Sequence, residues 1–323
     1  MKKFALIAGA AALALVAAQP ARALDKLRVA NPAAVAFSFV PMNVGMEKGI
    51  FAKHGLDIDY IGIAGSAKIQ QAMIADAIDI SVSAGPEFHF VVKGAPEVGI
   101  AAMAGPPLLL TLIVLKDSPY HSVKDLKGIK VAVSTAGGLT DWLPRELSRQ
   151  QGWGPNDIEP VGVGGTQAML ASLKNKQTQG LMSGINQAWD LEAAGVTRTL
   201  VKFGDIVPDF IMHVIYATNK IVEKNPDAVR RYLAAWFETI KFMRENKAES
   251  VRIAAPIIGS SPEITAKTYD YLMPMFSDTG KFEPKAVKVL ARSFVDMGNL
   301  DKEPDLTKYY TEKFLPVNNP ATH

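Results

Sequence analysis

The segment from Val44 to Tyr60, VGMEKGIFAKHGLDIDY, constrains the fold more than any other part of the chain. Its apolar residues can be buried on one side, and Gly49 and Gly55 stand where a helical turn ends with a positive φ angle. After Gly55, apolar and polar residues alternate as they do in a half-buried strand. Together with the preceding apolar stretch Leu27–Ala30, the segment predicts a strand-helix-strand unit.

The first 23 residues are typical of an export leader. Two lysines precede an apolar run from Phe4 to Ala18, and the Ala-Arg-Ala triplet at 21–23 has the form that signal peptidase cleaves. The apolar run is too short for a membrane-spanning helix, which needs about 20 residues. We therefore expect residues 1–23 to be a signal peptide that is removed after Ala23.

The chain contains no cysteine. An exported protein of this composition has no disulfides and lacks the residue that carries the acyl anchor of bacterial lipoproteins, so we expect a periplasmic protein without a lipid anchor. Loss of the leader removes Lys2, Lys3 and Arg22 and no acid, which lowers the formal net charge from +3 to zero. Neither nucleic acid nor an anionic membrane is indicated as a partner.

The mature chain, of about 300 residues, exceeds one comfortable hydrophobic core, which predicts two domains. Strand-like and helical segments alternate along most of it, which is typical of α/β lobes with mainly parallel sheets. The predicted strands are Leu27–Ala30, Leu56–Ile61, Ile78–Val82, Leu109–Leu115, Lys130–Val133, Glu159–Val163, Gly180–Met182 and His213–Thr218.

Helical signals mark two further parts of the chain. Ser122–Gly128 predicts a short helix capped by its serine, where the alternation restarts in a second lobe. From Asn225 onward the chain is mainly helical, with helices beginning at Pro226, Pro262 and Pro284.

Small polar residues follow nearly every predicted strand. Ligands of open parallel sheets collect at the carboxyl ends of the strands, so these loops predict one shared cleft. Ser66 and Thr166 are also expected to be helix N-caps. The candidate ligand residues are Phe37, Ser38, Phe39, Gly65, Ser66, Ser83, Gly85, Glu87, Ser134, Thr135, Gly137, Gly138, Thr140, Gly165, Thr166 and Asn186.

Charged residues near these loops leave the charge of the ligand open. Glu87 and Asp141 stand at helix N-termini, where they either face water or favour a ligand with a donor or a positive charge. Lys68 is either a solvated lysine or a contact for an anion.

Motifs for cofactors, metals and catalysis are weak or missing. Gly162–Gln167 has glutamine where a dinucleotide loop has its last glycine, and the chain has no G-x-x-x-x-G-K-[ST] phosphate loop. There is no G-x-S-x-G motif and no cysteine nucleophile. The five histidines lack the spacing of metal ligands, so we expect them to be structural. They are His54, His89, His121, His213 and His323. We therefore expect the protein to bind no metal and no cofactor and not to be an enzyme.

Two segments carry a resemblance to a known family. Val44–Leu56 is similar to the pattern A-x-E-x-G-[FY]-F-x-x-x-G-L, and Ser122–Val133 is similar to s-x-x-D-L-k-G-k-x-v-a-v. Asn225–Arg230 also resembles the family's helix after the second crossover. Over nearly its whole mature length, the chain resembles the periplasmic substrate-binding proteins of ABC importers. Within them it resembles the nitrate, sulfonate, taurine and thiamine-precursor group called NMT1/THI5-like or SsuA/TauA-like.

The resemblance implies a two-lobed periplasmic-binding-protein type II fold with two hinge crossovers. The lobes would close over a ligand, and the expected monomer would present it to an inner-membrane ABC permease and its ATPase. We place the crossovers near Leu115–Pro119 and Val207–Met212. Lobe 1 is then expected to comprise 24–119 and 211–323, and lobe 2 to comprise 120–210.

The family's ligand loops fall on the candidate residues above, with Asp209 added at the second crossover. Two departures accompany this assignment. Gln177–Leu181 lacks the acid of the family's usual G-x-[VI]-D-A strand entry, and the loops contain no arginine. An anion would therefore depend on N–H groups, hydroxyls and Lys68.

The expected function is the capture of a small organic anion, of the sulfonate or carboxylate type, for an ABC importer. The alternative ligand is a nitrogen heterocycle such as a thiamine pyrimidine precursor, covered by Phe37, Phe39 or Trp142 and held by Glu87. Another possible function is that of a periplasmic sensor subunit, which passes its closed state to a receptor rather than to a permease. The leader and the absence of cysteine argue against an enzyme, although eukaryotic relatives of this family make the thiamine pyrimidine.

Overall fold

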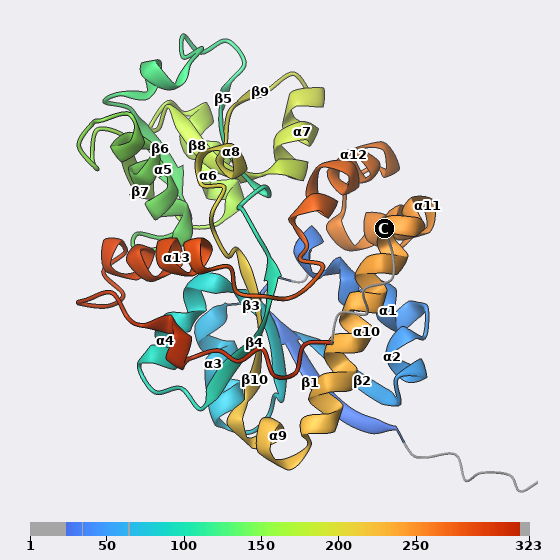
Figure 1. The fold of residues 1–323 in the computed structure, drawn as a ribbon. Helices are drawn as coiled ribbons and strands as arrows, with labels where there is room; N and C mark the ends of the chain where they lie inside the picture. The colour runs from blue at the N-terminus through green and yellow to red at the C-terminus, as the bar shows by residue number, and fades with distance from the viewer. Residues whose placement is uncertain (1–23, 34, 64, 317–323) are drawn as a thin grey trace, which may run out of the picture.

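The structure is a computed structural model that describes residues 24–33, 35–63 and 65–316. Two five-stranded sheets with flanking helices form two lobes (Figure 1). This confirms the predicted two-lobed α/β fold. The predicted leader lies outside the described residues.

The first sheet has the strand order β2-β1-β3-β10-β4. β1 pairs in parallel with β2 and β3, whereas β10 pairs antiparallel with β3 and β4. The strands are β1 (Asp25–Asn31), β2 (Leu56–Gly62), β3 (Ile80–Ala84), β4 (Glu97–Ala104) and β10 (His213–Thr218).

The second sheet repeats this plan in the order β7-β6-β8-β5-β9. β6 pairs in parallel with β7 and β8, and β5 pairs antiparallel with β8 and β9. The strands are β5 (Leu110–Leu115), β6 (Lys130–Val133), β7 (Glu159–Gly162), β8 (Gly180–Gly184) and β9 (Thr197–Lys202).

Each sheet is mixed because one of its strands enters from the other lobe. β5 follows the first crossover and β10 follows the second, so both run against their parallel neighbours. The crossover predicted at Leu115–Pro119 is wrong, since Leu110–Leu115 already pairs with β8 and β9. The chain passes between the sheets at 105–109, a stretch that contains Pro106 and Pro107, and it returns between β9 and β10. We accordingly propose that the second lobe begins at β5.

Helices cover the faces of both sheets. Those around the first sheet are α1 (Val40–Glu47), α2 (Ile50–Lys53), α3 (Ser66–Ile74), α4 (Phe88–Val92), α9 (Asn219–Lys224) and α10 (Pro226–Glu245). Those of the second lobe are α5 (Leu139–Gln150), α6 (Thr166–Lys174), α7 (Ile185–Ala193) and α8 (Phe203–Ile206). The C-terminal third adds α11 (Lys247–Ile258), α12 (Pro262–Leu272) and α13 (Pro284–Asp296). The 3-10 turns are η1 (Phe37–Phe39), η2 (Gly85–Glu87), η3 (Val123–Leu126), η4 (Met273–Met275) and η5 (Leu306–Lys308).

Several local predictions can be compared with these elements. Gly49 and Gly55 have φ angles of 68° and 71°, as the turns of the opening segment require. α10, α12 and α13 each begin at the predicted proline. At η3, Ser122 is the N-cap as predicted, and Asp125 completes a capping box, since its carboxylate accepts the backbone N–H groups of residues 121 and 122 at 2.8 Å.

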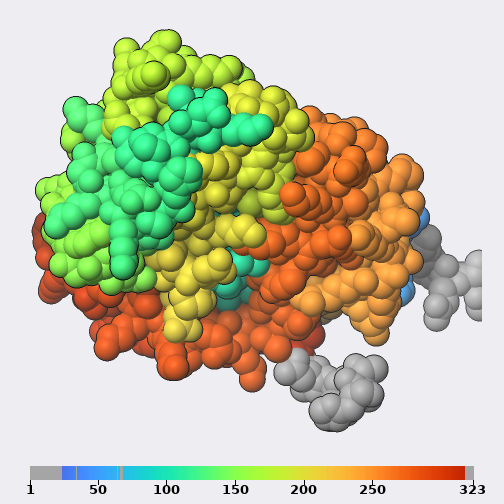
Figure 2. Space-filling view, turned by 90° about the horizontal axis from the view of Figure 1, so that it is seen from above, coloured from blue at the N-terminus to red at the C-terminus, as the bar shows by residue number. Residues whose placement is uncertain are grey.

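The C-terminal helices connect the lobes. α12 packs against α7 of the second lobe, and α13 packs against η2 of the first. Seen from above, the orange C-terminal helices lie against the yellow and green surface of the second lobe (Figure 2). Within the described ranges, no helix combines the length and apolar character that crossing a membrane would require.

Candidate functional site

The predicted ligand loops gather at two edges, one on each sheet. β2, β1 and β3 are parallel neighbours, so the loops that follow them lie side by side at what we call the first loop edge. The loops after β7, β6 and β8 form the second loop edge in the same way. β10 starts beside the end of β3 and β5 starts beside the end of β8, so both crossovers connect these edges. The topology therefore brings the two edges toward each other.

The aromatic residues of the first loop edge are part of the core. The Phe37 ring lies edge-on to Tyr269, with centroids 6.4 Å apart, and also contacts Phe276. The Phe39 ring lies edge-on to the imidazole of His213 at 5.2 Å. Both phenylalanines are buried, as is Ser38 between them. They shape the wall of the first loop edge from inside the lobe.

The loop after β3 is held against the second crossover. Gly85 donates its N–H to the carbonyl of Met212 at 2.9 Å. A Cβ atom at Gly85 would lie 2.0 Å from the carbonyl oxygen of Ile211, so only glycine permits this approach. Ser83 is also buried.

Glu87 lies inside the first lobe rather than in water. Its side chain is 3% exposed, and Oε1 accepts the N–H of Ala84 at 3.4 Å. Burial raises the pKa of Glu97 to about 8, and the charge of Glu87 raises it further. Glu87 therefore belongs to a buried polar group with Glu97, where it is poorly placed to anchor a cationic ligand.

The second loop edge is more open to solvent. Thr135, Gly165 and Thr166 are exposed, and Asn186 is half-buried. Ser134 and Thr140 close the loop after β6, since their hydroxyl oxygens lie 2.9 Å apart. This loop also contains Gly137 and Gly138, of which Gly137 has a φ angle of 72°. Asp209 is exposed in the second crossover.

Four helices start at these edges without a side-chain cap. α3, α5, α6 and α7 follow Gly65, Gly138, Gly165 and Gly184, and no side chain accepts a hydrogen bond from the first turn of any of them within the described structure. The predicted caps Ser66 and Thr166 are instead the first residues of their helices. Elsewhere, α9, α10 and α12 are capped by Thr218, Asn225 and Ser261, whereas α1, α2, α4, α8, α11 and α13 also start without a side-chain cap as far as the structure describes the chain. The first-turn N–H groups of Lys68, Asp141 and Ile185 already donate to the carbonyls of Gly65, Gly138 and Leu109. The remaining first-turn N–H groups at the loop edges are available to a ligand.

Two further candidates are committed to other contacts. Trp142 is fully buried, stacks on Phe210 with ring centroids 5.4 Å apart, and donates to Asp296 at 3.0 Å. It does not cover a ligand as the heterocycle hypothesis requires. Asp141 is buried and accepts from Arg145 at 2.8 Å, whereas Lys68 is exposed.

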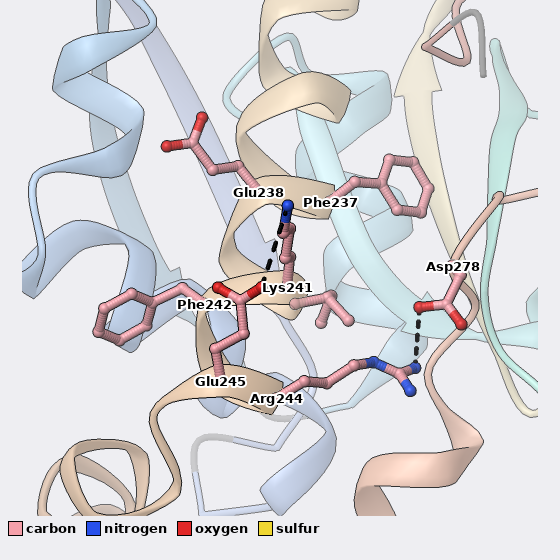
Figure 3. Close-up of a pocket in the computed structure, with 8 residues that line it drawn as sticks. Phe237, Glu238, Lys241, Phe242, Arg244, Glu245 and Asp278 are labelled. Atoms are coloured by element: carbon pink, nitrogen blue, oxygen red, sulfur yellow. Dashed lines mark ion pairs between the residues drawn. The ribbon is translucent and has the colours of Figure 1, made fainter. Parts of the chain in front are cut away.

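Four surface pockets formed by described residues lie away from the loop edges. One, of about 930 Å³, lies on the outer face of α10 (Figure 3). Its charges are already paired, Lys241 with Glu245 at 3.9 Å and Arg244 with Asp278 at 3.0 Å. A second, of about 500 Å³, lies beyond the end of β5. Neither of these two contains a candidate residue. Among residues with described positions, no three histidine or acidic side chains come together as a metal site.

Comparison with known proteins identifies the family. The family described as NMT1/THI5 like matches residues 36–250. The chain belongs to this family. The resemblance drawn from Val44–Leu56 and Ser122–Val133 is thus confirmed.

The relatives that match this NMT1/THI5-like chain by sequence include one from Haemophilus influenzae and one from Brucella abortus. A Haemophilus influenzae protein named for thiamine biosynthesis is 33% identical over 121 residues, which cover 37% of this chain and 38% of that protein. A Brucella abortus protein named as a binding protein is 25% identical over 217 residues, which cover 67% of this chain and 66% of that protein. The alignments thus span less than two thirds of either relative.

Solved structures share the fold. The periplasmic aliphatic sulphonate binding protein SsuA of Escherichia coli superposes with a TM-score of 0.75 at 19% identity, over 88% of this chain and 91% of that chain. A Candida albicans gene product with the generic periplasmic binding protein fold gives 0.72 at 15% identity, over 92% and 99% of the two chains. The desulfurization enzyme DSZB gives 0.66 at 15% identity, over 90% and 97%. The fold is therefore that of periplasmic binding proteins, and it also supports an enzyme.

Proposed function

We propose that this NMT1/THI5-like protein is the periplasmic solute-binding component of an ABC import system. Its ligand is a small organic anion of the sulfonate or carboxylate type. The anion binds between the two loop edges, and the lobes close over it through the crossovers. The inner-membrane permease and its ATPase are the partners that receive it.

The uncapped helix N-termini carry this proposal. A helix N-terminus attracts anions because its N–H groups point outward and its dipole is positive there. Gly65 on the first loop edge, and Gly138, Gly165 and Gly184 on the second, leave four such termini without a side-chain cap. The loops contain no arginine, so N–H groups and the hydroxyls of Thr135 and Thr166 take its place.

The relatives support an anion as well. The SsuA structure is that of a sulphonate-binding protein and the Brucella abortus relative is named as a binding protein, whereas the Haemophilus influenzae relative is named for thiamine biosynthesis. The heterocycle alternative depended on Glu87 and Trp142, both of which are buried in other contacts. DSZB leaves an enzyme as a rival, but this chain has no cysteine nucleophile.

A thermal-shift panel tests the proposal on refolded, ligand-free protein. The panel contains MOPS, taurine, hexanesulfonate, succinate and 4-amino-5-hydroxymethyl-2-methylpyrimidine. A ligand present at 100 times its Kd raises the free energy of unfolding by about 2.7 kcal/mol. We expect this shift for at least one anion and not for the pyrimidine. Binding of the pyrimidine alone, or turnover of any ligand, contradicts the proposal.

Export is tested separately by N-terminal sequencing of the protein recovered from a periplasmic fraction. The expected first residue is Leu24. A chain that still begins at Met1 contradicts a periplasmic location.

A further inference from the structure

His213 stands at the first loop edge, although its sequence context indicated only a structural role. It opens β10, where its backbone pairs with Ala84 of β3 on one side and Ala104 of β4 on the other. Ala84 directly precedes η2, and Ala104 directly precedes the first crossover. The residue therefore lies where the ligand loop after β3 meets both passages between the lobes.

The imidazole also touches the ligand loop after β1. The Phe39 ring meets it edge-on, with centroids 5.2 Å apart and planes at 84°. Phe39 ends η1, the turn that follows β1. His213 is thus positioned between the loops after β1 and β3, which are side by side in the first sheet.

Three polar groups of the first loop edge have no hydrogen-bond partner in the described part of the chain. They are Nδ1 of His213, which is 4% exposed, Oγ of Ser38, the residue before Phe39, and Oγ of Ser83 on β3, both of which are 0% exposed. Leaving a buried polar group unsatisfied costs about 1–3 kcal/mol. A bound ligand would supply the missing partners.

The imidazole is uncharged at this position. Burial lowers the pKa of His213 to about 3, so the ring keeps one N–H donor and one bare nitrogen acceptor. The Ser38 hydroxyl donates or accepts. Such a pair suits the oxygen atoms of a ligand without adding a charge, which agrees with loops that lack arginine.

We propose that His213 and Ser38 contact the ligand directly and form the polar floor of its site on the first loop edge. This inference rests on the proposed function and names the side chains that hold the ligand from that side. The uncapped helix N-termini of the second loop edge bind it from the other.

Calorimetric titration of His213→Phe and Ser38→Ala tests this assignment. The ligands are MOPS, taurine, hexanesulfonate and succinate, and circular dichroism confirms the fold of each variant. Whichever ligand the wild type binds should bind each folded variant at least tenfold more weakly. The matched control is His121→Phe, which changes an exposed ring of the second lobe and should retain affinity within twofold.

Ser38→Ala removes a single oxygen atom, so it keeps the test available if His213→Phe does not fold. Retained affinity in the folded variants overturns the inference and leaves the proposed function standing. Failure of the wild type to bind any anion overturns the proposed function and this inference with it.

Nitrogen NMR of the histidine rings adds a second measurement. A ligand should not change the chemical shifts of a histidine that has only a structural role. In ¹⁵N-histidine-labelled wild type, the bound anion should shift the ring signals of His213 and leave those of His54 and His121 unchanged. Unchanged His213 signals at saturation contradict direct contact.

Discussion

Trp142 of α5 donates a hydrogen bond from Nε1 to the Asp296 carboxylate of α13 across 3.0 Å. The same carboxylate accepts from Arg149 at 2.8 Å, and Glu146 of α5 accepts from Arg292 of α13 at 2.8 Å. α13 also packs against η2 of the first lobe. Figure 1 shows this helix running between the second lobe and the first sheet. α13 is therefore a link between the lobes as well as a wall beside the ligand loops.

Replacing Asp296 by alanine should weaken this link. The change leaves the indole N–H of Trp142, a fully buried residue, without its acceptor, and it removes one of the two carboxylates that Arg149 contacts, the other being Glu146. We expect the free energy of unfolding in urea to fall by about 1–3 kcal/mol. The control Asp227→Ala breaks the ion pair of an exposed carboxylate with Arg231 in the first turn of α10 and should cost less than about 1 kcal/mol. Equal losses in the two variants would show that the link contributes no more than a surface ion pair.

A negative charge introduced at Gly165, the N-cap of α6, should affect helix stability and ligand affinity in opposite directions. Gly165 has φ −69° and ψ 169°, and a Cβ there meets no atom within 4 Å, so both serine and aspartate fit as N-caps. Each should stabilise the helix by about a few tenths of a kcal/mol. Gly165→Asp should also repel an anionic ligand and weaken its binding at least tenfold, whereas Gly165→Ser should weaken it much less. Calorimetric titration and thermal melting measure the two effects. Equal affinities for the two variants contradict anion binding at this terminus.

Local sequence signals predicted most of the regular elements. Their success depended on contacts between near neighbours, as in α10, where Asn225 and Pro226 define the first turn. β4 (Glu97–Ala104) and β9 (Thr197–Lys202) were not predicted. β4 has few β-branched residues and is rich in alanine and glycine, so its strand conformation depends on pairing with β10.

The candidate site was less predictable, because its character depends on contacts between distant parts of the chain. The preference of serine and threonine for N-caps favoured Ser66 and Thr166, but the preceding glycines occupy those positions and leave the N–H groups open. The first crossover was misplaced because sheet pairing decides which lobe β5 joins. The burial of His213 beside Phe39 is likewise set by packing across more than 170 residues of chain, as the numbering shows.

Gly85 should be nearly intolerant of a side chain. Its missing Cβ would overlap the carbonyl oxygen of Ile211 at 2.0 Å, and this backbone atom belongs to the second crossover. Gly85→Ala should therefore lower stability by about 1–3 kcal/mol, measured as a fall in the urea midpoint. Gly165→Ala is the matched control, since a methyl group there enters open space. A Gly85 variant as stable as this control would mean that the loop after β3 is free to leave the crossover.

The buried carboxyl of Glu97 should make the protein less stable as the pH rises. Burial raises its pKa from 4.5 to about 8, and the nearby charge of Glu87 adds to the effect. Between these two values the unfolded chain has released the proton and the folded chain retains it. The free energy of unfolding therefore falls with rising pH, by up to about 1.4 kcal/mol per pH unit, and the loss is complete above the folded pKa. Glu97→Gln, which cannot ionise, should flatten this dependence in urea unfolding across the window, whereas the exposed Glu245→Gln should leave the wild-type slope unchanged. Parallel pH profiles for wild type and Glu97→Gln would mean that Glu97 is already ionised in the folded protein.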